Sequence, residues 1–134
     1  MQWNEIKSEQ DLQSFLELFG NFHDSCLKEM RYISGAYVGE DLAMNPINNQ
    51  RKLYVVLQRQ YRDMTTVEIE FSGLVKLNLA PCDEGYTCEI LDAAMFFEDG
   101  LVYWADSENF TKQRTEYDGT WLCAKKAAWR VVEQ

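Results

Sequence analysis

The chain has few basic residues, little histidine or proline, and no long hydrophobic run. Its 134 residues include one histidine, two prolines and 13 lysines and arginines against 22 aspartates and glutamates, for a formal net charge of −9. No apolar run exceeds five residues, so neither a membrane span nor the core of a signal peptide is expected. The acidic balance disfavours binding to nucleic-acid phosphates and anionic lipid. We therefore expect a cytoplasmic protein that binds neither nucleic acid nor membranes.

The rest of the composition is that of a folded domain. Hydrophobic residues make up 46% of the chain and aromatic residues 13%, which is enough to bury a core and argues against intrinsic disorder. Single hydrophobic cores usually extend over about 100 to 150 residues. Residues 1–134 are therefore expected to form one domain.

The cysteines are expected to be free thiols and not to bind a metal. Without a signal peptide, a reducing compartment is the default, and disulfides are rare there. Cys82 and Cys88 have five residues between them, which is not the spacing of a zinc knuckle, and His23 is the only histidine. The chain has no Gly-rich phosphate loop, no Gly-x-Ser-x-Gly elbow and no local signature of a Cys/His dyad. We expect no metal, no cofactor and no catalytic residue of a known type.

One amphipathic helix is predicted over residues 9–19. Ser8 provides an N-cap and Gly20 a stop signal. The apolar residues between them recur at helical spacing, so this stripe is expected to pack on a sheet. They are Leu12, Phe15, Leu16 and Phe19.

Beyond the helix, β-branched and aromatic residues predict about six antiparallel strands. Residues 66–79 alternate between apolar and polar side chains, with Gly73 as a bend or bulge. Residues 25–34 suit a strand better than a helical turn, residues 124–128 also fit a helix, and residues 35–52 are predicted to be a long loop. The fold is expected to be α+β, with one N-terminal helix on a curled, partly closed sheet. The other predicted strands are residues 53–62, 89–97, 101–106 and 120–132.

The negative charge is concentrated in residues 83–118. This segment has ten acids against Lys112 and Arg114, a net charge of −8. Three interpretations remain open: solvated turns that keep the protein soluble, a surface that attracts a basic protein partner, and a calcium site that lacks the ligand order of an EF-hand. The candidate partner-binding residues are Glu98, Asp99, Asp106 and Glu108.

The pair His23-Asp24 is the only one that suggests acid–base chemistry. An imidazole beside a carboxylate can act as a general base when a nucleophile or water is within reach. Adjacent residues point to opposite faces of an extended chain, however, and a His-Asp metal pair would need further histidines. The favoured interpretation is structural, with Asp24 accepting backbone N–H bonds after the helix and His23 bonded and partly buried.

Two further side chains are candidate ligand contacts. Arg59 has the same parity as the apolar residues of its strand, so it is expected to point inward at the rim of the sheet, where it protects an edge strand or binds an anion. Trp104, and Trp129 with Arg130, suit either core packing, which is favoured, or a stacking platform. A cavity lined by His23, Arg59 and Trp104 would make the protein a small-molecule binder or an enzyme.

Several short strings resemble a group of small uncharacterised bacterial proteins. The first of them also resembles the Phe-His-Asp-(Ser/Ala) opening of some immunity proteins of bacterial toxin systems. The resemblance implies an intracellular bacterial protein and transfers no catalytic residue. The strings are Phe22 to Ser25, Tyr37 to Leu42, Gln58 to Gln60, Val67 to Phe71, and Trp129-Arg130.

The leading hypothesis is therefore a non-enzymatic, immunity-like binding protein that presents its acidic 83–118 surface to a basic protein partner. The alternative is the small-molecule binder or enzyme described above. A third hypothesis is an oligomerising domain in which tyrosines and tryptophans at sheet edges form a homo-oligomer.

Overall fold

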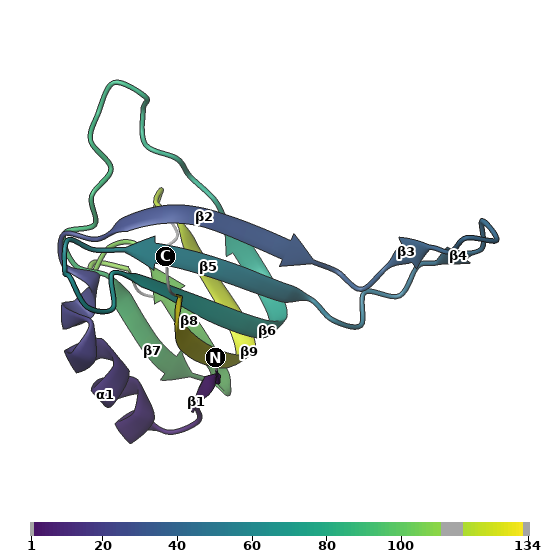
Figure 1. Cartoon of the computed structure of the whole chain (residues 1–134), viewed down its shortest axis with the longest axis horizontal. Coiled ribbons are helices and arrows are strands. Elements are labelled where there is room, and N and C mark those ends of the chain that lie inside the picture. The colour runs from purple at the N-terminus through teal and green to yellow at the C-terminus, as the bar shows by residue number, and fades with distance from the viewer. Residues whose placement is uncertain (1, 111–116, 133–134) are drawn as a thin grey trace.

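The computed structural model describes residues 2–110 and 117–132. They form one α-helix, a 3₁₀ turn and nine strands (Figure 1). In chain order these are β1 (Asn4–Ile6), α1 (Glu9–Leu18), η1 (Gly20–Phe22), β2 (Cys26–Ile33), β3 (Tyr37–Val38), β4 (Met44–Asn45), β5 (Lys52–Gln58), β6 (Thr66–Asn78), β7 (Ala94–Glu98), β8 (Leu101–Ala105) and β9 (Trp121–Val132).

The main sheet is antiparallel, as predicted, and has seven strands. Its order is β2-β5-β6-β9-β8-β7, and β1 also pairs with β9. The seventh strand is β1, which is too short and too polar to stand out in the sequence. The prediction of a curled, partly closed sheet is wrong. Closure would require β2 and β7 to pair along their length, but β2 runs on toward β3, and the bridge between Ser25 and Ile90 is the only pairing between the two edges in the part of the chain that the structure describes.

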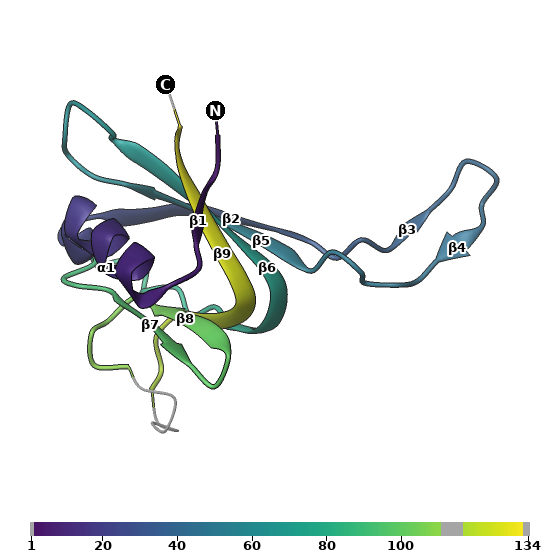
Figure 2. The same cartoon turned by 90° about the horizontal axis from the view of Figure 1, so that it is seen from below.

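The helix forms where the sequence predicts it and covers one face of the sheet (Figure 2). Ser8 Oγ accepts the Asp11 N–H at 3.1 Å, and Asp11 Oδ2 accepts the Ser8 N–H at 3.2 Å, which completes a capping box. Phe15 is fully buried, with its ring centroid 5.3 Å from that of Trp129 on β9. The apolar stripe therefore anchors α1 to the centre of the sheet.

The two longest strands, β6 and β9, bend together (Figure 2). Gly73 has φ +65° and the register of the pair shifts between Leu74 and Lys76, so the predicted bend at Gly73 is confirmed. Residues 124–128 lie within β9 and are not helical. The strand predicted over residues 25–34 is also confirmed, as β2.

Other predicted boundaries are wrong. The strand expected over residues 53–62 ends at Gln58, because Arg59 N–H bonds Thr65 O at 2.9 Å and closes a turn. The strand expected over residues 89–97 begins at Ala94, since the bridge to Ser25 occupies Ile90. The segment predicted as a loop contains β3 and β4, whose hairpin projects far from the sheet (Figures 1 and 2).

The apolar side chains form two clusters on opposite sides of β8. Val102 and Trp104 belong to the main core under the helix, whereas Tyr103 and Ala105 belong to a smaller core on the other side. Among the described residues, no helix is long and apolar enough to cross a membrane.

Candidate functional site

A cleft of about 400 Å³ lies beneath the segment that joins β6 to β7. Its lining is mainly apolar, and this volume is within the range of ordinary ligand sites. Carboxylates stand among the apolar groups. The lining includes Leu27, Leu79, Pro81, Tyr86, Ile90 and, as acids, Asp83, Glu84 and Asp106.

Backbone and side-chain hydrogen bonds hold the two ends of this segment in place. At the start, Ala80 N–H donates to Thr120 Oγ1 at 3.0 Å, and the Thr120 hydroxyl lies 3.3 Å from Ala80 O. At the end, Ile90 exchanges two backbone hydrogen bonds of 2.7 Å with Asp24 and Ser25. The cleft is thus built between β2, the end of β8 and the start of β9, while residues 81–89 remain exposed.

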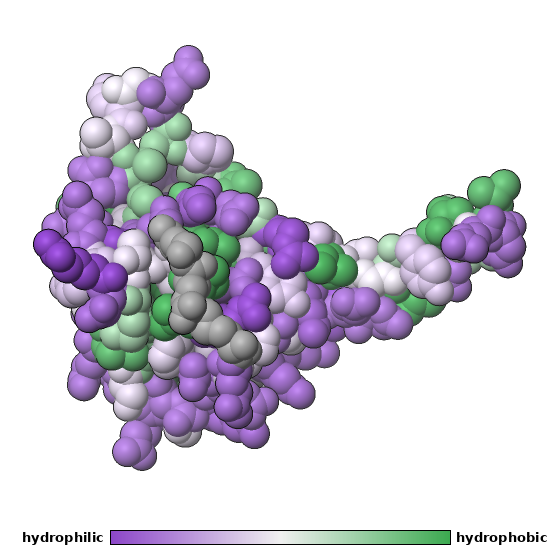
Figure 3. Space-filling model, in the orientation of Figure 1, coloured by the Kyte–Doolittle hydropathy of each residue, from purple (hydrophilic) through white to green (hydrophobic). Residues whose placement is uncertain are grey.

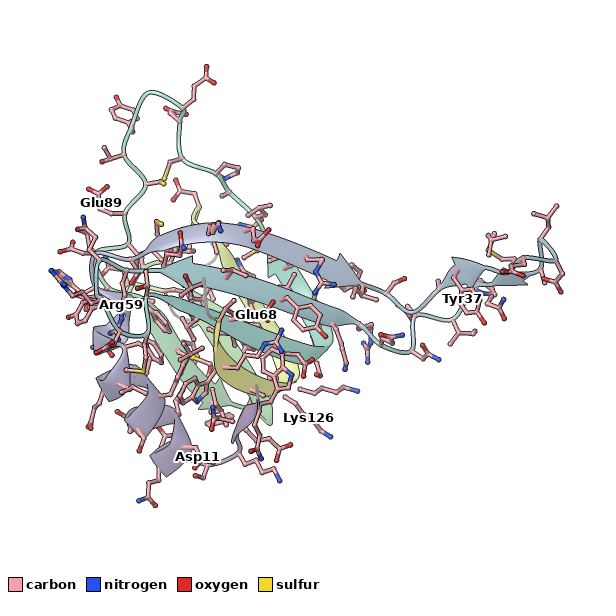
Figure 4. The ribbon with its side chains drawn as sticks, in the orientation of Figure 1. Asp11, Tyr37, Arg59, Glu68, Glu89 and Lys126 are labelled. Atoms are coloured by element: carbon pink, nitrogen blue, oxygen red, sulfur yellow. The ribbon has the colours of Figure 1, made fainter. Side chains whose placement is uncertain are left out.

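A second, smaller hollow of about 250 Å³ adjoins the cleft and carries more acids. Cys82, Cys88, Ile90 and Asp106 line both. The smaller hollow adds Glu89, Asp92 and Glu108 to the acids already named. Together the two hollows form one continuous acidic surface, which we call the acidic end (residues 79–92 and 106–109). Figure 4 shows Glu89 on this side of the molecule.

The structure divides the predicted partner-binding residues between two places. Asp106 and Glu108 belong to the acidic end. Glu98 and Asp99 lie at the turn between β7 and β8, and the register pairs Glu98 with Leu101 and Ala94 with Ala105. A five-residue strand, about 17 Å long, therefore separates Asp99 from Asp106. Lys112, Arg114 and Glu116, which also entered the predicted charge, lie outside the described residues.

Asp106 has a structural role within the acidic end. Its carboxylate accepts a hydrogen bond from the Tyr117 hydroxyl and one of 3.2 Å from Thr120 N–H. Burial, followed by the Asp106 contact, raises the pKa of Tyr117, which keeps this phenol protonated as a donor. Asp106 therefore fixes the floor of the cleft, whereas Asp83, Glu84 and Glu108 are exposed.

His23 bridges to the acidic end and is exposed, not partly buried as predicted. Its Nδ1 bonds Leu91 O and lies 3.3 Å from Asp92 Oδ1, and its Nε2 lies 3.4 Å from Asp24 Oδ2. The Leu91 carbonyl and then the Asp24 and Asp92 carboxylates raise the pKa of His23. Among the described residues, Asp24 accepts no backbone N–H; its own N–H donates to Ile90 O instead.

Arg59 points inward at the rim of the sheet, as its parity predicts, and is 9% exposed. Its Nε donates to Met64 O and its Nη1 to Leu18 O, both at 3.2 Å. The guanidinium lies over the rings of Tyr61 and Phe19, at 3.9 and 4.7 Å from their centroids. Arg59 therefore holds the C-terminal end of α1 to the β5–β6 turn.

Trp104 is fully buried in the main core. His23, Arg59 and Trp104 line neither of the hollows described here, so the structure does not unite them at a ligand site. Trp129 packs against Phe15 of α1 and against Phe19 at the C-cap of the helix, which bears out the packing interpretation. Arg130 instead pairs with Glu68 at 2.8 Å on the other face of the sheet.

Sequence reasoning missed the apolar part of the cleft. An acidic stretch separates Ile90 from Leu79 and Pro81 in the sequence, and the contacts at the two ends of the segment, Ala80 with Thr120 and Ile90 with Ser25, bring them together. Cys82 and Cys88 line the cleft as free, exposed thiols. No group of three His, Cys, Asp or Glu side chains suited to a metal occurs within residues 2–110 and 117–132.

Comparison with protein-family models, with curated proteins and with solved structures gave no significant match. The resemblance to immunity proteins therefore stays a prediction based on the strings quoted above.

Proposed function

We propose that the chain is a non-enzymatic binding protein whose acidic end receives a basic segment of a protein partner. The observation that carries the proposal is the cleft of about 400 Å³, apolar inside and edged by Asp83 and Glu84. Apolar walls favour an aliphatic or aromatic anchor, and the carboxylates favour lysine or arginine beside it. The resemblance of Phe22 to Ser25 to immunity proteins favours a toxin as that partner.

The acids would act mainly on the rate of encounter. Asp83, Glu84 and Glu108 are exposed, so their field reaches an approaching cation but is screened beyond about 10 Å at 0.1 M salt. Association should therefore slow as salt rises, whereas dissociation should depend mostly on the apolar anchor. Asp106 is excluded from this role because it supports Thr120.

The test compares two charge-reversal variants of equal net charge in binding to a peptide probe. The probe is a leucine flanked by lysines and arginines, and surface plasmon resonance measures its association rate. The double variant Asp83→Lys with Glu84→Lys should associate with the probe about tenfold more slowly than the unmodified protein. The control, Glu17→Lys and Asp63→Lys, changes two exposed acids away from the cleft and should alter the rate less than about twofold.

Equal association rates for the two variants would show that the acidic end does not attract a basic partner. A pull-down from the source cell that recovers no protein partner at low and at moderate salt would contradict a protein-binding function altogether.

A further inference from the structure

The hairpin of β3 and β4 stands apart from the rest of the fold. We call residues 35–50 the arm. Its two strands pair only through Tyr37–Asn45 and Val38–Met44, and it projects from the sheet on the side away from the acidic end (Figures 1 and 4). A two-stranded hairpin without a packing partner is marginally stable in water. The arm is therefore expected to have one.

The arm exposes large apolar side chains along most of its length. Five of them are 53–83% exposed, and Figure 3 shows hydrophobic residues gathered toward its far end. Exposed apolar groups gathered in one segment are typical of an interaction surface. They are Tyr37, Val38, Leu42, Met44 and Ile47.

Charge on the arm is confined to its tip. Glu40 and Asp41 are its only charged residues. Asp41 Oδ1 accepts the Ala43 N–H at 3.0 Å and shapes the turn. Glu40 forms no ion pair with any residue that the structure describes, and it is exposed.

The root of the arm carries the opposite charge. Arg51 is hydrogen-bonded to Leu74 at the bend of β6, with Leu74 N–H donating to Arg51 O at 2.9 Å. Lys125 and Lys126 lie across the same bend, since Lys126 pairs with Ser72 and the Lys125 side chain packs against Gly73. Both lysines are exposed and neither is ion-paired within the described part of the chain. Figure 4 shows Lys126 on β9, below the point where the arm leaves the sheet.

We infer that the arm binds the arm of a second copy of this chain, side by side and antiparallel about a two-fold axis. In that arrangement each acidic tip meets the basic root of the other copy, and the exposed apolar side chains of the two arms face each other. A two-fold interface needs such a self-complementary surface. Residues 35–41 span roughly 23 Å if extended, which is long enough to separate tip from root as distinct contacts.

The charge distribution favours a second arm over the cleft as the occupant. The cleft is edged by Asp83 and Glu84, which would repel Glu40 and Asp41. The arm lies on the other side of the molecule, so this inference is independent of the proposed function. A contact limited to two arms buries less than the usual 800 Å² or so per partner, so a dissociation constant on the order of micromolar is expected.

Sedimentation velocity of the whole chain, from about 1 µM to about 1 mM, tests for the dimer. Val38→Ser with Met44→Ser should weaken dimerisation about 100-fold, since four apolar side chains leave the symmetric interface. The matched control, Leu79→Ser with Leu91→Ser, removes two equally exposed apolar side chains at the acidic end and should leave the dimer unchanged.

A charge swap tests the antiparallel geometry. Glu40→Lys alone, and Lys125→Glu with Lys126→Glu alone, should each weaken self-association about tenfold by opposing like charges. An equimolar mixture of these two variants restores both tip–root contacts and should dimerise like the unmodified protein. A monomer at the highest concentration, an effect of the control equal to that of the arm variant, or a mixture no tighter than its components would each overturn the inference.

Discussion

Replacing Arg59 by alanine tests whether this buried cation is structural or serves a ligand. The side chain donates one hydrogen bond to the last turn of α1, at Leu18 O, and one to the β5–β6 turn, at Met64 O. Its guanidinium also lies over the rings of Phe19 and Tyr61. No other described side chain joins these two segments through hydrogen bonds in this way.

The expected loss follows from these contacts. A hydrogen bond from a charged donor contributes about 1.5–3 kcal/mol, and cation–π contacts add about 0.5–2 kcal/mol, the lower value for an exposed ring such as Tyr61. Desolvation of a buried cation opposes both by several kcal/mol. The net loss for Arg59→Ala should therefore be about 2–4 kcal/mol, a large part of the 5–15 kcal/mol typical of a domain.

Urea denaturation followed by circular dichroism measures this difference at constant m value. Arg62→Ala removes the same charge from an exposed position and should cost less than about 0.5 kcal/mol. A loss below about 1 kcal/mol for Arg59→Ala would refute the structural role and return Arg59 to the candidate ligand contacts.

Two further predictions concern the acidic end and the bend of the sheet. The contacts of His23 raise its pKa above the unfolded value near 6.5, so the protonated ring should stabilise the fold fully below pH 6.5 and lose this effect as pH rises through the folded pKa. The difference in unfolding free energy between the wild type and His23→Gln should therefore shrink over that pH range. A difference that stays constant with pH would contradict this prediction. Gly73→Ala should lower the free energy of unfolding by about 1–2 kcal/mol, because the φ of Gly73 is +65° and the new Cβ would lie 3.1 Å from Lys125 Cβ. The control Gly85→Ala places its Cβ in open space and should leave the free energy of unfolding nearly unchanged in the same urea assay.

Local signals in the sequence predicted the elements that have clear capping residues or a regular spacing of apolar side chains. The helix follows from Ser8, Gly20 and its apolar spacing, and β6 follows from the alternation of apolar and polar residues on the two sides of Gly73. β1 has three residues, and β3 and β4 have two each within a segment containing Gly39 and Pro46. Such short strands form because they pair with another strand and not because of their own residue preferences, so the local sequence does not predict them.

The site was harder to predict because its residues depend on register. Residues 83–118 hold one block of acids, yet the β7–β8 hairpin sends Asp99 to one end and Asp106 to the other. Trp104 was a candidate ligand contact, but both faces of β8 are covered by core clusters. The continuous apolar run from Leu101 to Ala105 is typical of such a doubly covered strand, and it was the available signal for burial.

The long strands explain how one small domain can separate two surfaces of different character. β6 and β9 carry the basic root of the arm at their shared bend, and β6 leads at its end into the acidic segment. The exposed acids of residues 83–89 therefore follow one end of this pair of strands, whereas Lys125 and Lys126 lie near its middle, at the bend. The cleft is therefore bordered by acids alone, whereas the arm has acids at its tip and basic residues at its root, so the two apolar surfaces present different patterns of charge to a partner. The arm and the acidic end can then select different occupants without competing for them.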